Sequence, residues 1–259
     1  MSPPSPPRPD PGTLYVHEGR TYLRAPVPLH FPEHETVPET KLHLELRTLL
    51  YQVLKLAFGN VHAIGCDQFV YWDASDPRRC LAPDGFVRKN ADDELFPVWK
   101  TWERGAPHVA IEIVSATDRD LGEQLARYRQ MGVVELIRFD CDDLARPLRV
   151  WDRVDEDLVE RSLLVVTEAE CTVLPVIWTV VPDPALGPSL RPADRSTRVL
   201  LPSPSELAIS ARDQAEAERG RAEAERERAE AERERAEAER ERADDAERRL
   251  RELEVKLSS

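Results

Sequence analysis

The stretch that decides the fold lies between residues 82 and 140 and contains APDGFV (82–87) and PHVAIEIVSATDRDLGEQLARYRQMGVVELIRFD (107–140). Two apolar runs in it each carry one acidic residue, Asp84 directly after a proline and Glu112 within VAIEIVS. A helix with one polar face is expected to follow, and it leads into a third apolar run. Because a helix between two strands is typical of a parallel crossover, the stretch predicts an α/β fold with a mixed sheet flanked by helices.

The two acidic residues point to a metal site. A carboxylate in a buried strand costs on the order of several kcal/mol unless a metal, a cation or a proton compensates it. Asp84 and Glu112, brought together from separate strands, would form the oxygen-rich site that Mg²⁺ or Mn²⁺ prefers. A structural ion pair at Glu112 is the alternative interpretation.

The helix after Glu112 carries further candidates. Asp120, Gln124 and Tyr128 are four residues apart and therefore form one polar stripe on the helix surface. Gln124 could serve the site or be an ordinary exposed helix residue, and Tyr128 could pack in the core or donate a hydrogen bond to the site. Thr117 or Asp118 is expected to cap the helix.

An earlier helix is predicted over residues 38–58, where apolar residues recur at spacings of three and four and Gly59-Asn60 ends the pattern. His43 lies on this helix, where it either is solvated or supports the site. A strand over residues 61–73 and another over 82–88 are expected to follow. Antiparallel strands at 147–154, 162–167 and 171–181 would then complete the sheet.

The chain ends differ from the middle. Residues 1–12 hold six prolines and predict a disordered arm, so the folded domain is expected to span residues 13–181. Residues 182–205 are rich in proline and predict a linker. Residues 206–259 predict a helical rod, because the heptad AEAERER repeats and alanine is the strongest helix former.

The rod is a weaker coiled-coil candidate. If Ala222 and its heptad equivalents are the a positions, the d positions fall on Glu225 and its equivalents, which favour water. Only Ala243, Ala246, Leu250, Leu253 and Leu257 form an apolar seam. We therefore predict a solvated helix with a short terminal zipper that could join two copies of the chain.

Charge and cysteine content restrict the partners. The net charge is −13 over 259 residues, and a basic surface for non-specific DNA binding is not evident from composition. The four cysteines form no CxxC pair, which argues against a zinc site and for free thiols. With no recognisable signal peptide and no apolar run near the membrane-spanning length, a cytoplasmic protein is expected.

Several separated motifs form a recognisable set: Glu39-Thr40 with His43, Pro83-Asp84, WKTWERG at 99–105, Glu112-Ile113-Val114-Ser115, Asp120, Tyr128, Gly132-Val133 and Glu135. In their order and spacing they resemble the restriction-endonuclease family often called the Uma family, which is part of the PD-(D/E)XK nuclease superfamily. The resemblance covers roughly residues 36–180.

The resemblance implies that Asp84 and Glu112 bind Mg²⁺ or Mn²⁺ for hydrolysis of DNA phosphodiester bonds, with His43, Asp120 and Tyr128 in support. The superfamily's third group is a lysine, located two residues after the glutamate or on the next helix. Here those positions are Val114 and Gln124, and glutamine can orient a water molecule but supplies no charge.

Four basic residues could replace the missing lysine: Arg88, Lys100, Arg119 and Arg127. Two functions follow from this pattern. The first is a metal-dependent endonuclease acting on DNA, with activity weakened by the missing lysine. The second is a catalytically inactive module with the nuclease fold, used for binding or assembly and oligomerised through the helical tail.

Overall fold

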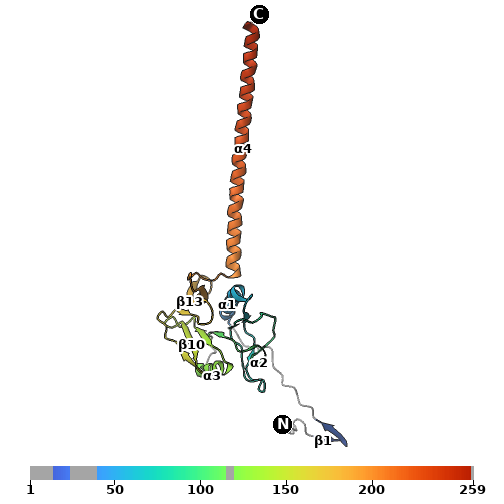
Figure 1. Cartoon of the computed structure of the whole chain (residues 1–259), viewed down its shortest axis with the longest axis vertical. Helices are drawn as coiled ribbons and strands as arrows, with labels where there is room; N and C mark the ends of the chain where they lie inside the picture. The colour runs from blue at the N-terminus through green and yellow to red at the C-terminus, as the bar shows by residue number, and fades with distance from the viewer. Residues whose placement is uncertain (1–13, 24–39, 115–119, 258–259) are drawn as a thin grey trace. The chain divides into compact units, whose positions relative to one another are not determined.

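The computed structural model describes residues 14–23, 40–114 and 120–257, and Figure 1 traces them along the chain. The predicted arm at 1–12 and the predicted caps Thr117 and Asp118 lie outside the described residues. The chain divides into two units, residues 1–203 and residues 204–259. The first unit contains every strand of the described chain and the second is one helix.

The elements have the following bounds. The helices are α1 (Lys41–Phe58), α2 (Thr101–Arg104), α3 (Leu121–Met131) and α4 (Pro204–Leu257). The strands are β1 (Leu14–His17), β2 (Arg20–Leu23), β3 (Ala63–Gly65), β4 (Val70–Tyr71), β5 (Cys80–Leu81), β6 (Gly85–Arg88), β7 (Trp99–Lys100), β8 (Val109–Ile113), β9 (Glu135–Phe139), β10 (Leu148–Val154), β11 (Asp157–Glu160), β12 (Glu168–Glu170), β13 (Val176–Asp183) and β14 (Gly187–Asp194).

A six-stranded sheet is the centre of the first unit, with the strand order β11-β10-β9-β8-β6-β3. Its neighbouring strands pair antiparallel except β8 and β9, which pair parallel and are joined through α3. A parallel pair needs a crossover connection, and α3 supplies it. The predicted mixed α/β sheet is therefore confirmed.

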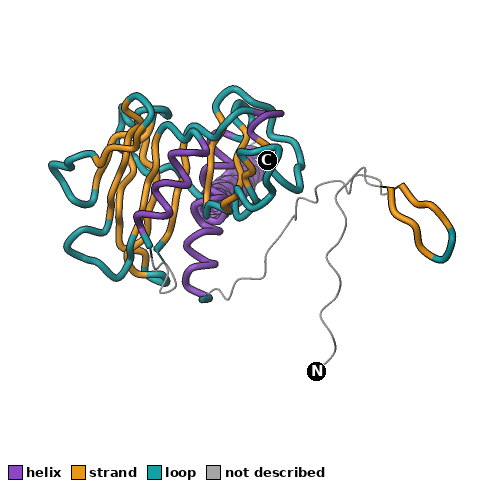
Figure 2. Tube along the Cα trace, turned by 90° about the horizontal axis from the view of Figure 1, so that it is seen from below, coloured by secondary structure: helices purple, strands orange, loops and turns teal. Residues whose placement is uncertain are grey.

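Both faces of this sheet are covered. On one face α1 packs with the three-stranded sheet β12-β13-β14, through buried residues that include Leu50, Leu54 and Trp178. On the other face α3 packs with the small sheet β5-β4-β7, through Tyr128 and Trp99 among others. Figure 2 shows the strands side by side, with helices against them. The sheet is consequently buried on both sides, as a parallel pair requires.

Side-chain caps fix the starts of the two helices that flank the sheet. The Thr40 side chain accepts a hydrogen bond from the backbone N–H of His43, and α1 begins directly after it. The Asp120 carboxylate accepts one from the N–H of Glu123 at 3.0 Å, so Asp120 is the cap of α3. Each cap satisfies an N–H that the helix itself leaves without a partner. At the other end of α3, Gly132 adopts a φ of 90°, which glycine tolerates best.

The prediction of a linker at 182–205 was wrong. The segment Gly187–Asp194 forms the eight-residue strand β14, which pairs antiparallel with β13. Proline lacks the N–H that a central strand must donate, so the proline content suggested irregular structure. Because β14 is the edge strand of its sheet, Pro188 and Pro192 are tolerated there.

Two other strand predictions also differ from the structure. The apolar run at 162–167 is not a strand, and Leu164 within it is fully exposed. The strand that pairs with β10 is instead β11, which follows a turn at Asp155-Glu156. The predicted strand at 61–73 is instead two short strands, β3 and β4, in different sheets.

The second unit is a single helix of 54 residues, α4 (Figure 1). Every side chain described from Pro204 to Arg249 is exposed. Pairs such as Arg212 with Glu216, four residues apart, join neighbouring turns. The side chains of Leu250, Leu253 and Leu257, on which the predicted zipper depends, lie outside the described part. No helix of the described chain has the length and apolar character needed to cross a membrane.

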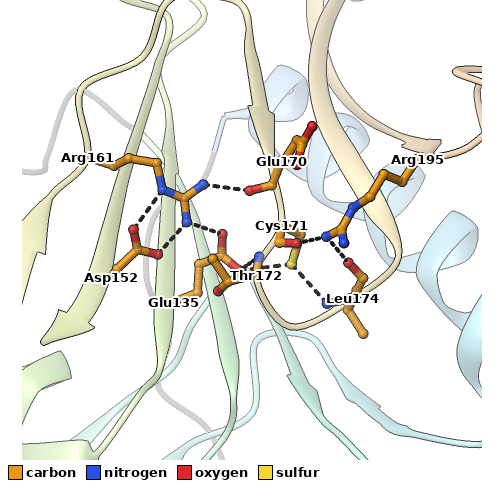
Figure 3. A network of polar contacts seen from close by, with 8 residues as sticks. All are labelled: Glu135, Asp152, Arg161, Glu170, Cys171, Thr172, Leu174 and Arg195. Atoms are coloured by element: carbon orange, nitrogen blue, oxygen red, sulfur yellow. Dashed lines mark hydrogen bonds and ion pairs between the residues drawn. The ribbon is translucent and has the colours of Figure 1, made fainter.

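A buried carboxylate joins the central sheet to the β12–β14 sheet. Glu135, at the start of β9, is fully buried, and its carboxylate accepts hydrogen bonds from Arg161, Cys171 and Thr172 (Figure 3). The same Arg161 guanidinium also binds both carboxylate oxygens of Asp152. Since Arg161 follows β11 and Cys171-Thr172 follow β12, Glu135 fixes how these two segments pack against β9.

Cys171 belongs to this network as a neutral thiol. Burial, with the Glu135 carboxylate as a further cause, raises the pKa of Cys171 to about 12. Its Sγ lies 2.9 Å from a Glu135 oxygen, and the S–H donates a hydrogen bond to that carboxylate. None of the four cysteines, all within the described residues, forms a disulfide.

Substitution of Arg161 by leucine should destabilise the first unit strongly. It would leave Glu135 and Asp152 without their guanidinium, and breaking a buried ion pair on one side typically costs about 3–5 kcal/mol. Urea denaturation of the full chain, followed by circular dichroism, measures the effect. The control is Arg78→Leu, which removes an exposed ion pair with Asp76 and should leave stability close to that of the wild type. Equal destabilisation by both variants would show that the Glu135 network does not hold the neighbouring segments together.

Candidate functional site

Asp84 lies directly before β6 and is 7% exposed. Its Oδ2 accepts a hydrogen bond from the backbone N–H of Ile113, the last residue of β8, at 2.7 Å. The carboxylate is thereby fixed against the end of the neighbouring strand. A charge-assisted bond of this kind is stronger than one between neutral groups.

His43 reaches the same place from α1. Its Nε2 lies 3.2 Å from Asp84 Oδ2 and 3.0 Å from the carbonyl oxygen of Ile113. A carbonyl accepts only, and so does an ionised carboxylate, so Nε2 must carry the proton and share it between both oxygens. The structure thus brings the predicted supporting residue His43 to Asp84.

Arg47 is a site neighbour that the sequence reasoning missed. Its guanidinium lies 3.9 Å from Asp84 Oδ1 and 3.0 Å from Asp67 Oδ2. The available signal was its position one helical turn after His43, because residues four apart lie on one face of a helix. Arg47 therefore places a positive charge beside Asp84.

Glu112 is in β8, with 9% of its surface exposed. The β6–β8 register pairs Gly85 with Ile111, and its continuation by one residue sets Asp84 across from Glu112. The hydroxyl of Tyr128, a fully buried residue of α3, donates a hydrogen bond to the Glu112 carboxylate. Glu112 is thus contacted from the α3 side, while Asp84 is contacted from the α1 side.

The polar stripe predicted on α3 is only partly directed to this site. Tyr128 reaches Glu112, and Gln124 is half-buried one turn earlier on the same helix face. Asp120 is exposed and caps the helix, so its carboxylate has a structural partner instead. Of the other two residues of the stripe, Gln124 is therefore the one that lies nearer to the Tyr128–Glu112 hydrogen bond along α3.

Three of the four basic residues considered as lysine replacements have partners elsewhere. Arg88 lies at the far end of β6 from Asp84 and donates to the carbonyl of Ala106. Lys100 pairs with Glu103, and Arg127 pairs with Glu123. Arg119 lies outside the described residues.

The donor set suits a hard divalent cation. In the described ranges no three His, Cys, Asp or Glu side chains gather in a way that could hold a metal ion. Mg²⁺, however, usually takes only one or two protein carboxylates and fills its remaining positions with water and substrate phosphate. Asp84 and Glu112, at the same end of adjacent strands, fit that requirement.

Comparisons with known proteins give a family match and a likeness to solved structures. A sequence model of the Uma2 family, described as "Putative restriction endonuclease", matches residues 33–180. The crystal structure of a protein described as a putative nuclease belonging to DUF820, from Anabaena variabilis ATCC 29413, is similar with a TM-score of 0.37 and 14% identity. That likeness covers 70% of this chain and 86% of the other. A search of curated proteins finds no match.

Removal of the Tyr128 hydroxyl should destabilise the fold, because the buried Glu112 carboxylate would lose a donor. Tyr128→Phe is expected to lower the free energy of unfolding by about 1–3 kcal/mol, the usual cost when a buried hydrogen bond to a charged group is removed. Urea denaturation measures this change. Arg127→Ala, which breaks an exposed pair one residue earlier on α3, serves as the control and should cost about 0.5 kcal/mol or less. If Tyr128→Phe were as stable as wild type, the hydroxyl would not be holding Glu112.

Proposed function

Because the chain belongs to the Uma2 family of putative restriction endonucleases, we propose that it is a metal-dependent nuclease that hydrolyses DNA phosphodiester bonds in the PD-(D/E)XK manner. One observation carries this proposal: two almost fully buried carboxylates, Asp84 and Glu112, lie at the same end of adjacent strands. Buried carboxylates grouped in this way are typical of functional sites.

In this proposal Asp84 and Glu112 hold Mg²⁺ or Mn²⁺. The bound metal would polarise the scissile phosphate and lower the pKa of an attacking water molecule. The remaining work falls to the protein's own side chains, which must hold the two carboxylates in place before substrate arrives.

His43 and Tyr128 provide that positioning. His43 fixes the Asp84 carboxylate from α1, and Tyr128 fixes the Glu112 carboxylate from α3. Because both helices are packed on the central sheet, the two carboxylates are restrained from both faces. Such restraint reduces the reorganisation needed when charge develops on the phosphate.

Gln124 is the weak point of the site. Its amide can accept and donate hydrogen bonds and could orient the attacking water, but it cannot stabilise negative charge as a lysine would. Arg47 supports partial compensation, since its guanidinium lies 3.9 Å from an Asp84 oxygen. We expect slow hydrolysis for this reason.

A second function is favoured by α4. An exposed helix of 54 residues with a strict heptad repeat is typical of assembly segments, and the charged repeat itself supports a solvated helix. In this alternative, the first unit binds a partner without hydrolysis and α4 joins two copies of the chain. The two proposals differ in whether the protein hydrolyses DNA, so a cleavage assay distinguishes them.

Loss of either proposed metal ligand should abolish cleavage. Supercoiled plasmid incubated with Mg²⁺ or Mn²⁺ should be nicked by the wild type, and Glu112→Gln or Asp84→Asn should slow nicking by about 100-fold or more. Glu103→Gln, at a half-exposed side chain paired with Lys100, should change the rate by about twofold or less. Cleavage retained in Glu112→Gln would contradict the assignment of Glu112 as a ligand.

Restoration of a lysine on α3 should increase activity. Gln124→Lys returns a cation beside Tyr128 and is expected to raise the nicking rate by about 10- to 100-fold through charge stabilisation. Gln130→Lys adds the same charge at an exposed position of the same helix and should leave the rate within about twofold. If neither the wild type nor Gln124→Lys cleaves supercoiled plasmid or single-stranded DNA, the assembly module is favoured instead.

A further inference from the structure

A second basic residue lies next to Glu112, on the neighbouring strand. The parallel register of β8 and β9 pairs Glu112 with Arg138. Side chains alternate along a strand, and Leu136, two residues before Arg138, belongs to the buried cluster on the α3 face. Arg138 therefore projects from the same sheet face as the Glu112 carboxylate.

The row continues onto the third strand. The antiparallel register of β9 and β10 pairs Arg138 with Arg149, and Arg149 lies on the same face as Trp151, since its guanidinium sits 4.7 Å from the Trp151 ring centre. Glu112, Arg138 and Arg149 thus form a lateral row across three adjacent strands. Asp84 stands at the acidic end of the row.

Arg149 already has an anionic partner. Its guanidinium binds both carboxylate oxygens of Glu160, at 2.9 and 2.7 Å. The hydrogen bonds to Glu160 hold the pKa of Arg149 above its usual value. Arg149 is therefore a fixed cation that is neutralised within the protein.

Arg138 is different. Its Nε is buried and has no hydrogen-bond partner, and no ion pair joins its guanidinium to any side chain between residues 40 and 114 or 120 and 257. Arg138 also faces Arg149 across the strands, but the Glu160 carboxylate is already bound to Arg149. In a chain with a net charge of −13, anionic partners are plentiful, so an arginine that carries none is costly to keep.

An anionic ligand would supply the partner that Arg138 lacks. A guanidinium binds phosphate through two parallel N–H bonds, and adjacent strands are separated by about 4.8 Å. A phosphate bound to Arg138 would accordingly lie one strand away from the proposed metal ligands. The partly exposed side chain leaves that position accessible to an outside anion.

We propose that Arg138 forms a phosphate-binding subsite that holds the DNA backbone next to the Asp84–Glu112 pair. The proposal rests on the proposed function for the identity of the ligand. It assigns Arg138 a role in substrate binding, through a contact that positions the phosphate backbone.

Binding without cleavage tests the subsite directly. The full chain is titrated into a short fluorescein-labelled DNA duplex in Ca²⁺, over a series of salt concentrations, and anisotropy is measured. Arg138→Gln should weaken binding by about tenfold and reduce the slope of log Kd against log salt by about 1, the value for one lost phosphate contact. Arg138→Lys should retain the slope, because the charge remains. It should bind more weakly than the wild type, because lysine lacks the planar guanidinium that binds phosphate through two N–H groups.

The matched control removes an arginine elsewhere. Arg78→Gln, at an exposed turn, lowers the net charge equally and should leave affinity and slope unchanged. Equal losses in Arg78→Gln and Arg138→Gln would overturn the subsite in favour of bulk charge. Unchanged binding in Arg138→Gln, or no binding by the wild type, would overturn it as well.

Two parallel measurements separate this proposal from its neighbours. Plasmid nicking is followed with the same variants. If Arg138→Gln weakens DNA binding but no variant nicks plasmid, the phosphate subsite holds and the proposed hydrolysis is rejected. If the wild type nicks plasmid but Arg138→Gln binds DNA as tightly as the wild type, hydrolysis holds and the subsite is rejected. Thermal unfolding should show Arg138→Gln at least as stable as wild type, because no internal partner is lost. A fall of several degrees would identify Arg138 as a structural residue.

Discussion

The parallel pairing of β8 with β9 constrains everything at the candidate site. Two parallel neighbours cannot be joined by a tight turn, so the chain must cross over the sheet, and α3 is that crossover. The crossover carries Tyr128 to the carboxylate of Glu112. The same pairing fixes the register that sets Arg138 beside Glu112. A different strand order would separate all three residues.

The sequence was sufficient for the features that depend on local pattern. The apolar runs around Asp84 and Glu112, with a polar-striped helix after the second, predicted the mixed sheet, and the structure has it. Four-residue spacing placed Gln124 and Tyr128 on one helix face, where the structure also has them. The end of α1 followed from Gly59-Asn60, but the helix starts did not follow from the predicted residues. Thr40, which was not predicted as a cap, precedes α1, and Asp120 rather than Thr117 or Asp118 caps α3.

Features that depend on pairing between distant segments were beyond the sequence. The contact of Asp84 with His43 and Arg47 requires α1 to pack across the ends of two strands, and no local pattern encodes that packing. Arg138 was not singled out from the sequence, and its neighbour Glu112 becomes evident only once the β8–β9 register is known. The prolines of β14 led to the wrong prediction of a linker. Whether a strand tolerates proline depends on its position at the edge of a sheet, which is a property of the tertiary structure.

Those prolines have a further consequence. An edge strand normally exposes a row of amide donors that can recruit another chain into a shared sheet, which is a route to aggregation. Pro188 and Pro192 remove two of the donors of β14. They lie at even spacing, so both interrupt the same hydrogen-bonding rim of the strand. The two prolines consequently make this edge of the β12–β14 sheet a poorer template for a strand of another chain.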